Sequence, residues 1–195
     1  MSGIDLERQR KVLDRHITFF HFKRARVCVQ KGLRSARGQK DKFFTYYFLA
    51  QNCILDEKFY RAIIYLNRAL LVRPADGCAF NDKALCLAEL KKYKPALDCF
   101  DLGLRRDSGC ASLYHNKGWL LHLLGRYKEA VLCFHKVLEL DSHRVEAVYS
   151  LGDAYLRLGQ REKALLYFQA AAGQVKGKSG FIYREILKSI ENAKR

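Results

Sequence analysis

The stretch VEAVYSLGDAYLRLGQREKALLYFQAAAGQVKGK, residues 145–178, decides the fold because its pattern occurs three times before it, at a spacing of 34 residues. Repetition at a fixed period is the sequence signature of an array of stacked structural units. Small residues recur at positions 8 and 20 of each unit, and a large apolar residue recurs at position 24. The units are 43–76, 77–110, 111–144 and 145–178; position 8 holds Ala50, Ala84, Gly118 and Gly152, position 20 holds Ala62, Ala96, Ala130 and Ala164, and position 24 holds Leu66, Phe100, Phe134 and Phe168.

The spacing of apolar and turn residues predicts two helices of about 14 residues, joined by a short turn, in each unit. Alanine or glycine is needed where two helices cross closely, and the large residue at position 24 is expected to fill the gap toward the neighbouring unit. Gly125 and Gly159, at position 15, are placed to end a first helix in the left-handed conformation. Pro95 lies early in a second helix, where a missing N–H costs little, and Pro74 lies between two units.

The fourth unit has Leu151, Gly152, Tyr155, Ala164, Phe168 and Ala171 at positions 7, 8, 11, 20, 24 and 27. This pattern resembles the tetratricopeptide repeat, which also has proline at position 32, where the first unit has Pro74. The resemblance covers residues 43–178. It implies an all-α fold, a right-handed α-solenoid of tetratricopeptide helix pairs that together form an α-α superhelix. It says little about function, because such repeats bind many unrelated partners.

The N-terminal residues 1–42 form a basic helical segment that precedes the four clear repeats. Residues 9–42 would be a degenerate repeat with Cys28 at position 20 and Ser35 at position 27. A turn or kink near His21–Lys23 would divide the segment into two helices. The segment is therefore a true repeat, a cap or a nucleic-acid-binding arm. Its expected apolar stripe consists of Leu6, Leu13, Ile17, Phe20 and Val27.

The C-terminal residues 179–195 are expected to form a capping helix, since one helix pair cannot bury its own apolar face. Ile182, Ile186 and Ile190 follow one another at intervals of four residues, which places them on one side of a helix. We expect this side to cover the end of the last repeat.

The tetratricopeptide resemblance also implies a concave groove, lined by the first helix of each unit. Aromatic side chains are frequent anchors at interfaces, because their rings bury much area and lose little entropy. We therefore expect a partner peptide or helix to bind in a groove centred on Trp119 and Tyr149. The alternative for Trp119, the only tryptophan, is that it packs in the core. The expected groove residues are Phe44, Tyr47, Gln51, Asn81, Leu85, His115, Trp119, His122, Tyr149, Asp153 and Arg157.

The resemblance does not extend to repeats that bind the acidic, EEVD-type C-terminal tails of heat-shock chaperones. Those repeats hold two carboxylates with lysines, asparagines and an arginine. Neither register of this clamp supplies the lysines and the arginine, so we expect a different partner. The clamp positions hold Tyr47, Gln51, Asp82, Ser112 and Asn116 in one register, and Asn81, Leu85, Asn116, Glu146 and Ser150 in the other.

The chain is strongly basic, with a formal net charge of +16, and residues 1–42 carry half of that excess. Cationic helices neutralise phosphates and aromatic rings stack on bases, so nucleic-acid (RNA) binding by this segment is the alternative function. An acidic protein partner or, more weakly, an anionic membrane surface would suit the same charge. The aromatic residues of this segment are Phe19, Phe20 and Phe22, and we favour an interpretation in which they cap the core and the cations are solvated. The candidate anion-binding residues are Arg8, Arg10, Lys11, Arg15, Lys23, Arg24, Arg26, Lys31, Arg34 and Arg37.

The sequence contains no recognisable catalytic, cofactor-binding or metal-binding motif, so we expect a non-enzymatic scaffold or adaptor. Its seven cysteines are odd in number and lack Cys-x-x-Cys spacing, which favours reduced thiols in a cytoplasmic protein over disulfides or zinc. The N-terminus lacks the apolar region of a signal peptide, and no run of 18 apolar residues could span a membrane.

Overall fold

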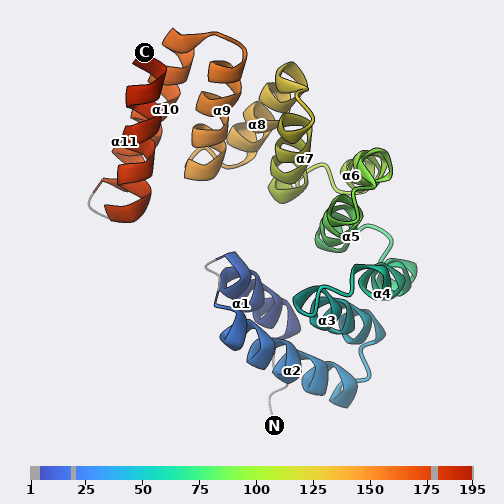
Figure 1. Cartoon of the computed structure of the whole chain (residues 1–195). Helices are drawn as coiled ribbons and strands as arrows, with labels where there is room; N and C mark the ends of the chain where they lie inside the picture. The colour runs from blue at the N-terminus through green and yellow to red at the C-terminus, as the bar shows by residue number, and fades with distance from the viewer. Residues whose placement is uncertain (1–4, 19–20, 177–179, 195) are drawn as a thin grey trace. The chain divides into compact units, whose positions relative to one another are not determined.

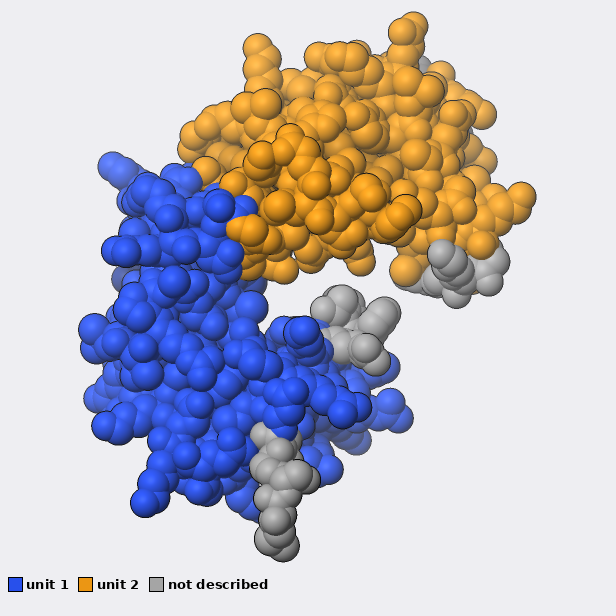
Figure 2. Space-filling view, turned by 180° about the vertical axis from the view of Figure 1, so that it is seen from behind, with its two compact units in different colours: residues 1–108 blue, residues 109–195 orange. Residues whose placement is uncertain are grey.

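The computed structural model describes residues 5–18, 21–176 and 180–194, apart from the side chains of Arg15, Thr18 and Phe181. Every regular element in these ranges is an α-helix, and consecutive helices pack as antiparallel pairs (Figure 1). This confirms the all-α prediction. The chain divides into two compact units, residues 1–108 and 109–195 (Figure 2). None of the described helices combines the length and the apolar character that crossing a bilayer requires.

The first unit contains three helix pairs, and the second contains two pairs and a final single helix. In both units the helices of a pair come from neighbouring segments of sequence, so their contacts are local. The helices of the first unit are α1 (Leu6–Thr18), α2 (Phe22–Gly38), α3 (Lys42–Leu55), α4 (Phe59–Val72), α5 (Gly77–Glu89) and α6 (Tyr93–Arg106). Those of the second unit are α7 (Ala111–Leu123), α8 (Tyr127–Leu140), α9 (Val145–Arg157), α10 (Arg161–Val175) and α11 (Gly180–Lys194).

The turns inside the four repeats share one backbone conformation. In each turn the residue at position 15 has a positive φ, which is 75° at Gly125 and 73° at Gly159, as the sequence predicted. The equivalent residues of the first unit are Glu57 and Lys91, both with a φ of 57°. A side chain in this conformation costs roughly 1 kcal/mol relative to glycine. The turns of the first unit are therefore closed at some cost in stability.

A phenylalanine ring lies directly over a glycine in both repeats of the second unit. A Cβ atom built on Gly152 would lie 2.6 Å from Cδ1 of Phe168, and one on Gly118 would lie 2.8 Å from Cε1 of Phe134. Carbon atoms do not approach so closely, so these positions accept glycine alone unless the ring moves. The small residues were predicted correctly. The ring at position 24 packs against the glycine of its own helix pair. At Phe168 the ring also belongs to a cluster with Ile186 and Ile190 of the following helix, as the sequence predicted.

The same contact occurs in reverse at the start of the chain. Gly32 of α2 occupies position 24 of the predicted degenerate repeat, where the regular repeats have a large side chain. The ring comes from Phe48 of α3, and a Cβ atom on Gly32 would lie 2.5 Å from its Cζ. The glycine is therefore on the second helix of a pair and the ring on the first helix of the next. This exchange keeps α2 close to α3 without the usual repeat pattern.

The structure bears on three expectations for residues 1–42. The predicted division into two helices near His21 is confirmed, because α1 and α2 are separate helices and α2 begins at Phe22. Leu6 and Leu13 are buried as expected, but Val27 is 56% exposed, because the break changes the direction in which the stripe points. Phe20 lies outside the described residues.

The last helix, α11, covers the end of α10. Ile186 and Ile190 are buried in a cluster with Phe168, in agreement with the predicted apolar stripe. Ile182 was expected on the same buried side but is 45% exposed. It lies in the first turn of α11, at the edge of the contact with α10, so the cap is shorter than the sequence suggested.

The glycine–phenylalanine contact predicts a large difference between two glycine substitutions in the second unit. Gly152→Ala should lower the free energy of unfolding by about 1–3 kcal/mol, because the new methyl group meets the ring of Phe168. Gly173→Ala is the matched control, since an added Cβ on α10 meets nothing within 4 Å. It should be neutral or stabilise by up to about 1 kcal/mol. Urea unfolding of the full chain would measure both, and equal effects would contradict this packing.

Candidate functional site

The expected groove residues of the first unit are buried. Phe44 and Tyr47 of α3 are 2% and 1% exposed, so the expectation that these rings line an open groove is wrong. Gln51 and Asn81 are also buried, and Leu85 of α5 is half-buried. The four buried side chains, those of Phe44, Tyr47, Gln51 and Asn81, are therefore not accessible to a partner.

Helix α1 provides the cover over α3. Nη1 of Arg10 donates to both carboxylate oxygens of Asp76, at 3.1 and 2.8 Å, and Nη2 lies 2.7 Å from Oε2 of Glu7. The guanidinium carbon lies 5.8 Å from the ring centroid of Phe44 and 5.4 Å from that of Tyr47. An arginine in this position pairs with the acid and stacks on the rings at once. Arg10 therefore acts as a structural residue.

A second arginine, Arg73 at the end of α4, strengthens the same cluster. Its Nη1 lies 3.1 Å from Oε1 of Glu7 and its Nη2 lies 3.3 Å from Oδ2 of Asp41. Its guanidinium carbon is 4.2 Å from the ring centroid of Phe43. The sequence analysis did not single out Arg73, Asp41 or Asp76. The available signal was an aspartate just before the first helix of each of the first two predicted repeats, because Asp41 and Asp76 cap α3 and α5.

Asp82 of α5 organises the polar residues beneath α1. Gln51 Nε2 donates to Oδ2 of Asp82 at 2.5 Å, Asn81 Nδ2 donates to Oδ1 at 3.3 Å, and the Tyr47 hydroxyl also donates to this carboxylate. Burial raises the pKa of Asp82 to about 6, although these hydrogen bonds and Arg10 act in the opposite direction. Desolvation and the nearby Asp82 raise the pKa of Asp14 on α1 to about 7, even though water reaches part of its side chain.

The second unit leaves part of its expected groove open. Trp119 of α7 is 46% exposed, so it is neither a core residue nor fully free. One turn along, Nε2 of His122 lies 2.9 Å from Oδ2 of Asp153 on α9, although the contact does not have hydrogen-bond geometry. Nε of Arg157 lies 4.0 Å from Oδ1 of the same carboxylate. The structure thus brings four predicted residues together across two helices.

One residue of this surface was missed by the sequence analysis. Leu123 of α7 is 57% exposed and lies four residues after Trp119, which puts both on the same side of the helix. It occupies position 13 of its unit, the same position as the predicted groove residue Arg157 in the next unit. We call the surface formed by Trp119, His122, Leu123, Asp153 and Arg157 the α7–α9 face.

His115 and Tyr149 lie deeper than expected. The Tyr149 hydroxyl is 3.1 Å from the Ser189 hydroxyl of α11, and its ring packs 5.4 Å from that of Phe168. His115 Nδ1 is buried without a hydrogen-bond partner. Burial, with a smaller effect of Arg144, lowers the pKa of His115 to about 4. Both side chains therefore support the fold of the second unit more than they line a surface.

The ten candidate anion-binding residues have different roles in the structure. Arg10 pairs with Asp76, and Arg26 pairs with Asp56 at 2.5 Å while donating to the Leu55 carbonyl at 2.8 Å. The side chain of Arg15 lies outside the described residues. The other seven form no ion pair with any described residue, namely Arg8, Lys11, Lys23, Arg24, Lys31, Arg34 and Arg37.

Comparison with known proteins identifies the family. Tetratricopeptide-repeat family models match residues 111–144 and residues 145–173. Residues 111–173 are tetratricopeptide repeats. These two tetratricopeptide matches begin where the third and fourth predicted units begin, and both lie in the second compact unit. No curated protein matches the sequence significantly.

Solved tetratricopeptide-repeat structures share the fold of the whole chain. Yeast Tom70 superposes with a TM-score of 0.74 at 18% identity, over 93% of this chain and 38% of Tom70. TTC0263, a thermophilic tetratricopeptide-repeat protein of Thermus thermophilus, gives a TM-score of 0.72 at 16% identity, over 95% and 98% of the two chains. YrrB, described as having an unusual peptide-binding site, gives 0.59 at 22% identity, over 85% and 84%. These likenesses confirm the α-solenoid fold.

The cluster beneath α1 predicts a structural role for Arg10. Its side chain is 13% exposed and that of Asp76 is 10% exposed. Arg10→Ala should lower the free energy of unfolding by about 2–3 kcal/mol, because it leaves the Asp76 carboxylate desolvated without its partner. Arg8→Ala removes an exposed cation from the same helix and should change stability by less than about 0.5 kcal/mol. Equal effects in denaturant unfolding would show that α1 does not depend on this pair.

The low pKa of His115 predicts acid sensitivity. The folded state keeps His115 neutral down to about pH 4, whereas the unfolded chain takes up a proton below about pH 6.5. The contribution of His115 to the free energy of unfolding is therefore at its maximum above pH 6.5. It falls as the pH drops, by about 1–3 kcal/mol at pH 4. His115→Leu should reduce this loss, and substituting the exposed His143 by leucine should not. Unfolding midpoints measured from pH 7.5 to 4.5 would test this, and identical profiles would contradict it.

Proposed function

We propose that this chain is a non-enzymatic scaffold or adaptor that binds a segment of a partner protein on its α7–α9 face. One observation carries the proposal: Trp119 presents about half of its ring to water, next to Leu123 and the charged group around Asp153. Partly exposed tryptophans are strongly enriched among residues that dominate binding energy. A surface that combines one large ring with a charged rim has the composition of an interface centre.

The chemistry of the α7–α9 face suggests what its partner supplies. Trp119 and Leu123 form an exposed apolar patch one helical turn long on α7. An aliphatic or aromatic side chain of the partner would cover this patch. Arg157 is exposed and could pair with a carboxylate of the partner, while Asp153 already has His122 and Arg157 beside it. An extended or helical segment with an apolar anchor and an acidic neighbour would match. The peptide-binding site of the structurally similar YrrB supports a peptide as the ligand class.

The anchor of this face differs from the pair predicted at first. The sequence favoured a groove centred on Trp119 and Tyr149. Tyr149 is half-buried and its hydroxyl is taken up by Ser189, so we propose Leu123 as the second anchor. The buried residues Phe44 and Tyr47 have no direct role in this proposal.

The alternative function is RNA binding by the basic N-terminal helices. Helix α2 supports it, because its 17 residues include six cations and no carboxylate. Of the three phenylalanines expected to stack on bases, Phe22 is 51% exposed, and Phe19 and Phe20 lie outside the described residues. We favour the α7–α9 face because stacking platforms usually need several rings. A reducing, cytoplasmic setting, predicted from the odd number of cysteines and their spacing, remains part of this proposal.

The sole tryptophan gives the proposal a direct test. Peptides selected from a random library on the immobilised full chain should change the fluorescence of Trp119 when titrated into it. Trp119→Ala should weaken their binding by about 30-fold or more, corresponding to a hot spot of about 2 kcal/mol. Leu132→Ala is the matched control, because Leu132 is a 70% exposed apolar residue on α8 in the same unit. Binding measured by calorimetry should be unchanged in this control.

The proposal fails if the selected peptides bind the Trp119→Ala variant as tightly as the parent and leave tryptophan fluorescence unchanged. A partner that is displaced by moderate salt and is indifferent to Trp119 would also contradict it, because an apolar anchor depends weakly on ionic strength.

A further inference from the structure

Helix α2 carries six exposed cations along its solvent side, one of which, Arg26, is paired with Asp56. Lys23, Arg24, Arg26, Lys31, Arg34 and Arg37 are all exposed, whereas the opposite side of the helix is buried against the core of the first unit. At 100° per residue the six cations fall within less than half of the helix circumference. Lys23 and Arg37 are about 21 Å apart along the axis. A surface of this kind attracts an anionic partner.

The charge near the start of α2 is unfavourable in the chain alone. Lys23 and Arg24 lie in the first turn, which contains no acidic residue, and the N-cap residue His21 makes no capping hydrogen bond with its side chain. The N-terminus of a helix carries a partial positive charge, so cations there destabilise it. Neither Lys23 nor Arg24 forms an ion pair with a described residue. A bound anion would remove this penalty.

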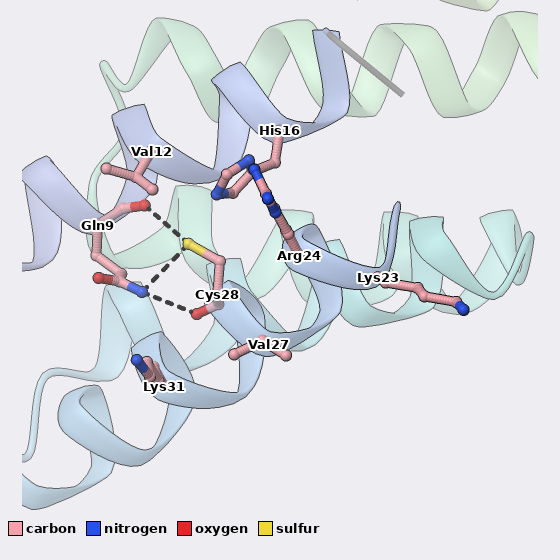
Figure 3. Close-up of a pocket in the computed structure, with 8 residues that line it drawn as sticks. All are labelled: Gln9, Val12, His16, Lys23, Arg24, Val27, Cys28 and Lys31. Carbon is pink, nitrogen blue, oxygen red and sulfur yellow. Dashed lines mark hydrogen bonds between the residues drawn. The ribbon is translucent and has the colours of Figure 1, made fainter. Parts of the chain in front are cut away.

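A cavity of about 400 Å³ lies between α1 and α2, next to these cations. Its walls are apolar, with Val12 from α1 and Val27 from α2 on opposite sides, and Gln9 is hydrogen-bonded to Cys28 between them (Figure 3). Arg24 and His16 lie at one end of the cavity in this view, and Lys31 lies at the other, below Gln9. The cavity thus combines apolar walls with a positive charge at both ends.

We propose that this cavity binds an acidic peptide segment, with one apolar side chain inserted between Val12 and Val27 and carboxylates on either side of it. Arg24 and Lys31 are seven residues apart, so they are separated by about 10 Å along α2. In an extended peptide, residues two before and two after a given side chain point the same way and lie about 13 Å apart. A segment of the type Glu-x-Leu-x-Glu therefore places its leucine in the cavity and its two carboxylates at Arg24 and Lys31.

The composition of the cavity favours a peptide over the other polyanions. A nucleic-acid base is held mainly by stacking on aromatic rings, and the ring that lines this cavity is His16 alone among its eight lining residues. A membrane-binding helix inserts its apolar side into the lipid, but the apolar side of α2 is packed in the protein core. Valine walls fit an aliphatic or aromatic side chain of a peptide. This surface is separate from the α7–α9 face and belongs to the other unit.

The test uses a labelled synthetic peptide with a central leucine and glutamates two positions away on each side, titrated into the full chain at physiological ionic strength. The double variant Arg24→Gln/Lys31→Gln should weaken binding about tenfold, as expected for two exposed charge pairs. The control variant Arg34→Gln/Arg37→Gln makes the same change in charge on the same helix, away from the cavity, and should weaken binding less than about threefold. Replacing the peptide's leucine by serine should also weaken binding about tenfold.

Four results would overturn the proposal. Equal losses in the two double variants, or equal binding of the leucine and serine peptides, would indicate attraction to charge alone. Tighter binding of a single-stranded RNA of matched charge, or of vesicles containing anionic lipid, with loss in both double variants, would identify a nucleic acid or a membrane as the partner. The substituted side chains are exposed, so circular dichroism should be unchanged in every variant. Trp119→Ala should bind this peptide normally, which separates failure here from failure of the proposed function.

Discussion

The fold depends on how closely the two helices of a pair can approach each other. In the second unit this distance is set by a phenylalanine ring resting on a glycine, at Gly118 with Phe134 and at Gly152 with Phe168. The glycine cannot be replaced without moving the ring, and the ring of Phe168 is also packed against Ile186 and Ile190 of α11. Each contact therefore fixes both the angle of one pair and the surface offered to its neighbour. The small and large residues recur every 34 residues because each helix pair must meet the same packing requirement.

The first unit is stabilised in a different way. Between its first two helix pairs the glycine and the ring occur in the opposite order, with Gly32 of α2 below Phe48 of α3, and its polar surface is closed by Arg10 and Arg73. These arginines connect the carboxylates that cap α3 and α5 to helix α1. The cationic residues of the N-terminal helices therefore have two different roles. Arg10 and Arg26 hold the unit together, while the remaining described cations of α2 stay free to attract a partner.

The sequence predicted the helix pairs, the small residues at the crossings and the glycine turns, because each depends on neighbours within 34 residues. It could not predict the burial of Phe44 and Tyr47, because their cover comes from α1, which lies outside the recognised repeats. It identified Trp119 but left its exposure open, because the repeat pattern does not show whether a neighbouring helix covers this residue. Leu123 and Arg73 were missed for the same reason. Their roles depend on which side of a helix its neighbours leave open, and a single repeat pattern does not state that.

Two half-buried ionisable groups, Asp82 in the first unit and His115 in the second, respond to acid in opposite ways. Folding of the first unit takes up a proton at Asp82 near pH 6, so mild acid favours it, whereas folding of the second unit excludes a proton from His115. Acidification therefore raises the free energy of unfolding of the first unit through Asp82 and lowers that of the second unit through His115. Because these two groups lie in different compact units, mild acid shifts the balance of stability away from the unit that carries Trp119 and toward the N-terminal unit.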